Sequence, residues 1–333
     1  MTLLRRRHAL LATVVTVGLL VAGCASDPDA GKERSGRIAI TYASFAGPTG
    51  LPAKFGQAKG FFEDAGLDVT FVKAEDPVAL VSSGDVDIAD SDTTSALIAA
   101  GKGAPIKIVS SMFRTKGPFY LLGDTDIASV KDLVGKKVGI GRKGSGLEAY
   151  TRVILRENGI DESQVTLVPN GSYQAALASV ENDQVDATII HEPFVSLAEA
   201  EKKGKLLAKG WDYLPTFHTG VEIAHERFIE ENPEALRKFL AAYFEAAEYA
   251  KAHPDEFEAF AAERTNVPRG VQAKALEREE PIWDNRPKVE LARLAQTQRI
   301  QQELGFQDEV YDPRDLVDDS YAPAGPERQK GRD

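Results

Sequence analysis

Two arginines and one glycine-rich turn have the residue types and positions of an anion-binding site. Arg114 and Arg142 are among the basic residues nearest the ends of predicted strands. A planar guanidinium holds a sulfonate or a carboxylate by two parallel hydrogen bonds. Gly144-Ser145-Gly146 precedes a predicted helix, whose free N–H groups and dipole favour an anionic or polar head group. These features predict a site for an organic anion, with solvated arginines and a plain glycine turn as the alternative.

Aromatic, hydroxyl and acidic residues follow several other predicted strands. Asp90 and Asp92 would repel an anion unless arginines match them, whereas their carboxylates suit the ring amines of a heteroaromatic solute. Tyr173 and Phe194 offer rings that stack on a flat solute, although a phenylalanine in the position of Phe194 is more often part of a core. The hydroxyls after the third strand also suit helix capping. The other candidates for ligand contact in these loops are Tyr42, Ser44, Phe45, Gly47, Ser91, Thr93, Asn170, His191 and Glu192.

Strand and helix patterns alternate along the chain and must position these loops. Residues 38–42 predict a strand, and Leu51, Phe55, Ala58 and Phe62 share one face of a helix that ends near Gly66. Such alternation specifies an α/β fold with a largely parallel sheet, whose ligand-facing loops lie at the carboxyl ends of the strands.

A second series of the same kind begins near Pro118, so we expect two lobes with a ligand cleft between them. Predicted strands at 119–122 and 220–224 cross between the lobes. A helical part follows, in which one face of a long helix is formed by Leu236, Leu240, Tyr243, Ala247 and Ala250. We expect lobe 1 to comprise residues 37–117 and 218–307, and lobe 2 residues 118–217. Residues 308–333 are acidic and contain several prolines, which predicts a poorly ordered tail.

Composition excludes several classes of protein. The chain has 333 residues, a formal net charge of −11 and a single cysteine. The acidic balance argues against a nucleic-acid partner, which needs a basic face. One cysteine excludes an intramolecular disulfide framework and CxxC-type metal sites. We expect a globular monomer without a metal or cofactor.

The first 24 residues resemble a bacterial lipoprotein signal. Three arginines at 5–7 precede an apolar run at 9–22 that is too short for an ordinary membrane span, and Leu20-Val21-Ala22-Gly23-Cys24 resembles a lipobox. We therefore expect residues 1–23 to be removed, Cys24 to be acylated and 24–36 to form a tether on the outer face of the cell membrane. The general secretory and twin-arginine routes both stay open.

Four segments in order resemble the extracytoplasmic solute-binding proteins of ABC importers for nitrate, sulfonates, taurine and thiamine-pyrimidine precursors. They are GFFEDAGLDV at 60–69, SGDVDIA at 83–89, SVKDLVGKKVG at 129–139, and the pair Asp186-Ala187 and Glu192-Pro193-Phe194. The resemblance covers roughly residues 37–306. It implies a two-lobed type 2 periplasmic-binding-protein fold that closes on a small solute and delivers it to a permease with its ATPase subunits.

Two ligand classes stay open within this resemblance. The arginines favour an aliphatic sulfonate or taurine-like anion, which is our first expectation. The aromatics and aspartates favour a thiamine-precursor pyrimidine or another heteroaromatic.

Enzyme interpretations find little support in the sequence. Gly139-Ile140-Gly141-Arg142-Lys143-Gly144 matches GxGxxG, but the next strand ends at Pro169-Asn170 without an acid to hold a ribose. No HExxH or GxSxG motif is present. A fungal pyrimidine synthase of the resembling fold depends on a cysteine-rich iron motif, which this chain lacks. We expect a binding protein, with a membrane-tethered enzyme or a sensor partner as the alternative.

Overall fold

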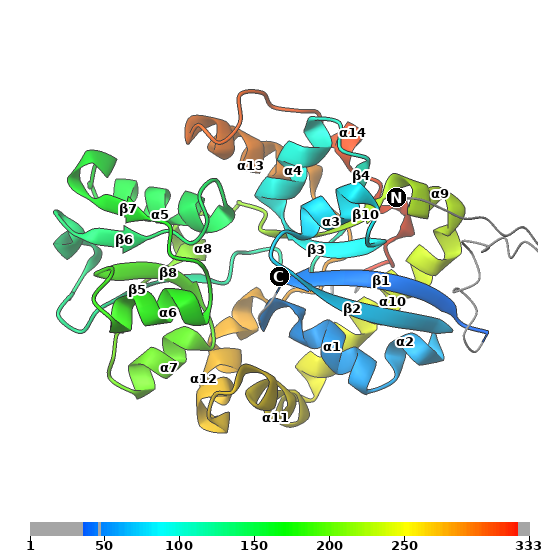
Figure 1. Ribbon diagram of the computed structural model, residues 1–333, viewed down its shortest axis with the longest axis horizontal. Coiled ribbons are helices and arrows are strands. Elements are labelled where there is room, and N and C mark those ends of the chain that lie inside the picture. The colour runs from blue at the N-terminus through cyan, green and yellow to red at the C-terminus, as the bar shows by residue number, and fades with distance from the viewer. Residues whose placement is uncertain (1–35, 46–47, 326–333) are drawn as a thin grey trace, which may run out of the picture.

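The computed structural model describes residues 36–45 and 48–325, and shows two five-stranded sheets side by side (Figure 1). The first sheet has the order β2-β1-β3-β10-β4 and the second β7-β6-β8-β5-β9. The strands of the first are β1 (Ile38–Phe45), β2 (Leu67–Ala74), β3 (Ile88–Asp92), β4 (Ile106–Ser111) and β10 (Gly220–His225). Those of the second are β5 (Phe119–Gly123), β6 (Lys137–Gly139), β7 (Thr166–Val168), β8 (Ala187–His191) and β9 (Lys205–Lys209).

The two sheets share one pattern of strand directions. In the first, β1 runs parallel to β2 and β3, and β10 is antiparallel to β3 and β4. In the second, β6 runs parallel to β7 and β8, and β5 is antiparallel to β8 and β9. The chain crosses between the sheets after β4 and returns before β10. Parallel strands place the loops that follow them at one edge of each sheet.

Helices cover both faces of each sheet. On the first sheet, α1 (Leu51–Ala58), α2 (Phe61–Asp64) and α10 (Pro233–Ala252) share one core, and α3 (Pro77–Ser83) and α4 (Thr93–Gly101) share the other. On the second, α5 (Gly146–Glu157) and α8 (Gly210–Tyr213) lie against one face, and α6 (Gln174–Glu181) and α7 (Phe194–Ala200) against the other. The expected buried stripe of α10 is confirmed, since Leu236, Leu240 and Tyr243 are all buried.

The predicted single helix over residues 51–66 is wrong, because it is broken at Gly60. Gly60 has a φ of 87°, the left-handed region in which glycine is favoured, so α1 ends and α2 starts in a new direction. Leu51, Phe55 and Phe62 are nevertheless buried in the same core.

The C-terminal helices contact both lobes. They are α9 (Glu226–Glu231), α11 (Pro254–Thr265), α12 (Arg269–Glu279), α13 (Leu291–Glu303) and α14 (Pro313–Leu316). Helix α12 packs against α7 of the second lobe, and Ile300 of α13 is buried in that lobe's core. Figure 1 shows α12 and α13 on opposite flanks of the junction between the sheets.

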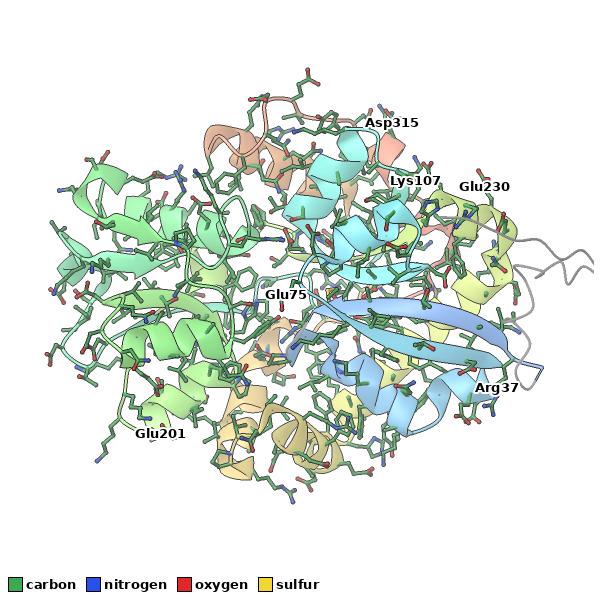
Figure 2. The ribbon with its side chains drawn as sticks, in the orientation of Figure 1. Arg37, Glu75, Lys107, Glu201, Glu230 and Asp315 are labelled. Atoms are coloured by element: carbon green, nitrogen blue, oxygen red, sulfur yellow. The ribbon has the colours of Figure 1, made fainter. Side chains whose placement is uncertain are left out.

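The expectation of a poorly ordered tail from residue 308 is wrong for residues 308–325. Leu316 is buried in a core of the first lobe, and Val317 forms a bridge to Ile108 at the free edge of β4. Lys107 Nζ donates to the Asp315 carbonyl at 2.7 Å, and the two residues lie close together in Figure 2. The acidic composition of this segment therefore did not prevent it from packing, because a few apolar residues and an unpaired strand edge were available. Among the described residues, no helix is both long and apolar enough to span a membrane.

Candidate functional site

A cavity of about 700 Å³ lies between the two sheets. This volume is within the range of about 300–1,000 Å³ that is usual for small-molecule sites. Its walls come from the ends of β2 and β3 on one side, from the loops after β6 and β7 and the end of β8 on the other, and from the two crossing segments. Figure 2 shows Glu75, which follows β2, at the junction of the lobes.

Eight of the predicted site residues line this cavity. They are Ser91, Asp92, Arg114, Arg142, Ser145, Gly146, Tyr173 and His191. They lie at the carboxyl ends of β3 and β8 or follow β4, β6 and β7, so the rule that ligand-facing residues lie at the carboxyl ends of parallel strands located them.

Three aromatic side chains form one wall of the cavity. The Tyr173 and His191 rings are 4.8 Å apart with an interplanar angle of 32°, and Phe119 meets His191 edge-on at 4.8 Å. Tyr173 is the residue before α6 and has a φ of 56°, an uncommon conformation for a residue other than glycine. Its hydroxyl lies 3.3 Å from Thr49 Oγ1 of the first lobe. These contacts therefore hold the Tyr173 ring at the wall in a fixed orientation.

His191 is uncharged at neutral pH. Burial and the neighbouring Arg114 guanidinium lower its pKa to about 3. Its Nδ1 is buried and has no hydrogen-bond partner among the described residues. A neutral imidazole has one donor and one acceptor nitrogen, so it can hydrogen bond to a polar ring atom without adding charge.

Arg114 does not face the cavity as an uncompensated charge. Its guanidinium pairs with the carboxylate of Glu279 at the end of α12, and the two side chains are only 7% and 10% exposed. The guanidinium also lies over the Phe113 ring, 4.6 Å from its centroid. Glu279 was missed from the sequence, because it is 165 residues from Arg114 along the chain.

Arg142 and the start of α5 also have carboxylate partners. Arg142 Nη2 is 3.4 Å from Asp92 Oδ2, a contact that spans the two lobes. The N–H of Gly144 donates to Glu148 Oε2 at 2.5 Å, so a first-turn carboxylate already occupies this loop. Ser145 donates to the Arg142 carbonyl and makes no side-chain cap to the helix.

Several predicted site residues pack within the lobes and do not line the cavity. The Thr93 hydroxyl lies 3.1 Å from Nδ1 of His218, and the side-chain oxygen of Asn170 accepts a hydrogen bond from the N–H of Gly141. Glu192 accepts hydrogen bonds from the N–H of Ser196 and from the Arg278 guanidinium. Phe194 belongs to the core of the second lobe, in agreement with the interpretation of this residue as a core side chain. The side chain of Phe45 and the whole of Gly47 lie outside the described residues.

Tyr42, Ser44 and Asp90 are part of a buried polar row on the first sheet. Tyr42 donates to Glu222 on β10 at 3.3 Å, and Ser44 donates to Asp90 at 2.7 Å. Burial raises the pKa of Glu222 well above its usual range, and the nearby Asp90 raises it further. None of these side chains lines the cavity.

The crossing segments supply cavity residues that the strand rule did not find. Lys116 and Pro118 lie on the outward crossing, and Thr219 and Gly220 on the return. Thr49, Lys73 and Gln174 were also missed. The sequence did predict that the chain crosses between the lobes near 118 and 218. Segments that join two lobes form the floor of the cleft between them, so this prediction could have identified the crossing residues.

The chain is similar in sequence to a known family and to several named proteins. The sequence profile described as "NMT1/THI5 like" matches residues 51–257. The riboflavin-binding protein RibY of Chloroflexus aurantiacus is 30% identical over 68% of this chain and 67% of its own length. A candidate aliphatic sulfonates-binding protein of Bacillus subtilis is 26% identical over 93% of this chain and 95% of its own.

Solved structures show the same fold. The periplasmic aliphatic sulphonate binding protein SsuA of Escherichia coli superposes with a TM-score of 0.69 at 20% identity, covering 84% of this chain and 97% of that one.

One further relative, from Saccharomyces cerevisiae, is 27% identical over 62% of this chain and 65% of its own length, and is named as a pyrimidine phosphate synthase.

Proposed function

Because the chain belongs to the NMT1/THI5-like family and has the type 2 periplasmic-binding fold, it is a substrate-binding protein of the ABC-import type, and we propose that its solute is a small flat heteroaromatic compound without net negative charge. The cavity between the lobes is the proposed site of capture. Closure requires only better contacts in the closed form than in the open one.

One observation carries this choice of ligand. Each of the three features that predicted an anion site is matched by a carboxylate of the chain itself. Glu279 pairs with Arg114, Asp92 with Arg142, and Glu148 with the loop before α5. An incoming anion would have to compete with these carboxylates, whereas an uncharged solute would not.

The aromatic wall supports the same choice. The Tyr173 ring offers a flat aromatic group held in place by His191, and a neutral imidazole suits a polar atom on a ring. A relative that is 30% identical is named for binding riboflavin, a flat heteroaromatic compound.

An aliphatic sulfonate is the second candidate. Lys73, Lys116 and Lys143 also line the cavity, so its edge carries positive charge in an acidic protein. The Bacillus subtilis relative matches almost the whole chain. This candidate requires that the lysines bind the sulfonate in place of the paired arginines.

The lipid anchor and the partners complete the proposal. Cys24 and the signal that precedes it lie outside the described residues, and we infer from their sequence that the body is tethered to the outer face of the cell membrane. The closed form would deliver its solute to a permease and its ATPase subunits as a monomer without enzymatic activity.

A thermal-shift screen of the full-length chain tests the ligand class. The probes are riboflavin, 4-amino-5-hydroxymethyl-2-methylpyrimidine, taurine and pentanesulfonate. A ligand present at about 100 times its dissociation constant stabilises the native state by about 2.7 kcal/mol, which raises the melting temperature measurably. We expect a shift with a ring compound. A shift with the sulfonates alone would contradict the proposed class and support the second candidate.

A further inference from the structure

Helix α12 brings a carboxylate from outside both sheets to Arg114, a residue that lines the cavity. Glu279, near the end of this helix, pairs with Arg114, which follows β4 on the crossing to the second sheet. Arg114 is fixed on a second side by the Phe113 ring. The guanidinium has five N–H donors, and Nη1 serves Glu279 while the side chain also lines the cavity.

The other charged groups near this pair have partners of their own. Glu192, after β8, accepts from Arg278 at 2.5 Å and from Ser196 at 2.9 Å. Arg278 also donates to Glu199 on α7 at 2.7 Å. Among the described residues, Glu279 is therefore the carboxylate that balances the charge of Arg114.

We propose that Glu279 is a specificity-determining residue, which neutralises Arg114 and so makes the floor of the cavity prefer an uncharged hydrogen-bond acceptor over an anion. This inference rests on the proposed function and deepens it. A paired guanidinium still donates hydrogen bonds to a ring carbonyl or ring nitrogen. An anion at the same position would meet an ion pair of zero net charge, and the carboxylate of that pair would repel it. The repulsion would be strong because charges are poorly screened in a buried place.

The preference is expected to depend on pH. Burial raises the pKa of Glu279 to about 7, against the opposing effect of Arg114. The groups that face it are Arg114, Glu192, Arg278 and, from β5, Tyr120. Protonation of Glu279 below neutral pH removes the balancing charge, so anion affinity should rise there. The pKa of His191 is about 3, so this histidine does not titrate in the same range.

A double-mutant cycle with two matched probes tests the inference. Benzenesulfonate and benzenesulfonamide share a ring and differ by one charge near neutral pH. At about pH 8, Glu279→Gln should raise the affinity for benzenesulfonate relative to benzenesulfonamide by about tenfold or more, since it removes one buried negative charge. In an Arg114→Gln background the same substitution should leave the ratio unchanged. Glu277→Gln, on the exposed face of the same helix, is the matched control.

The outcomes separate this inference from the proposed function. An unchanged ratio in Glu279→Gln, with binding intact, overturns the inference alone. A shift that persists in the Arg114→Gln background also overturns it, because Glu279 would then act through another group. If Glu279→Gln does not fold, the ratio in the unsubstituted chain must still rise toward benzenesulfonate between about pH 8 and about pH 6, and a flat profile refutes the role. Failure of the unsubstituted chain to bind both of these probes, together with no thermal shift from riboflavin or the pyrimidine, contradicts the proposed ligand class instead.

Discussion

Replacing Tyr173 by leucine should weaken binding of a ring compound while leaving the fold intact. The tyrosine ring lies 4.8 Å from His191 and forms part of a wall of the cavity, so leucine keeps an apolar side chain there but removes the flat face. Stacking of a base on an aromatic side chain contributes about 1–3 kcal/mol. At about 1.4 kcal/mol per tenfold change, this corresponds to an affinity loss of about 5- to 150-fold.

Fluorescence titration with riboflavin is the assay, since stacking on an aromatic ring changes flavin emission. Tyr173→Phe is the matched control: it keeps the ring and removes only the contact of the hydroxyl with Thr49 Oγ1 at 3.3 Å. We expect Phe to bind nearly as well as Tyr, and Leu to bind much less well. Equal dissociation constants for Leu and Tyr, with unchanged melting temperatures, would refute the assignment of this wall to the solute.

Three further predictions concern the anchor, the buried acid and the junction of the lobes. Cys24→Ala should leave the protein unacylated, and a variant that is still acylated and still partitions with membranes would contradict the lipobox interpretation. The pKa of Glu222 is raised, so the native state holds a proton that the unfolded state releases above about pH 4.5, and the unfolding free energy should fall as pH rises from there. Urea unfolding at several pH values should show a shallower fall in Glu222→Gln than in the unsubstituted chain. An identical slope in the two proteins would contradict a buried neutral acid. Arg278→Gln leaves Glu192 buried without its cation and should lower the unfolding free energy by about 3 kcal/mol, whereas the exposed Arg314→Gln should change it little. Similar losses in the two arginine variants would contradict that account.

Local sequence patterns predicted the fold well because they report local physics. Alternating apolar runs identified most strands and the buried stripe of α10, including Leu236 and Leu240. The break at Gly60 was missed, since periodicity continues through a glycine that redirects the chain. The packing of residues 308–325 was missed because the open edge of β4 that receives them is a feature of the assembled sheet.

The site was predictable only where a loop follows a strand. That rule found Asp92, Arg142 and His191, but it could not say that Asp92 and Arg142 pair with each other across the lobes. The partner of Arg114 lies on a helix far along the chain, and no local pattern marks Glu279. Residue types therefore predicted an anion site, while the tertiary contacts supply the carboxylates that change this expectation.

Isothermal titration calorimetry with riboflavin and pentanesulfonate on one preparation of the unsubstituted chain tests the central claim most directly. The account predicts that the uncharged ring compound binds more tightly by at least about tenfold, which corresponds to about 1.4 kcal/mol. It also predicts that this affinity changes little with salt, because no net charge is neutralised on binding. Tighter, salt-sensitive binding of pentanesulfonate would contradict the claim that the chain's own carboxylates have neutralised its anion site.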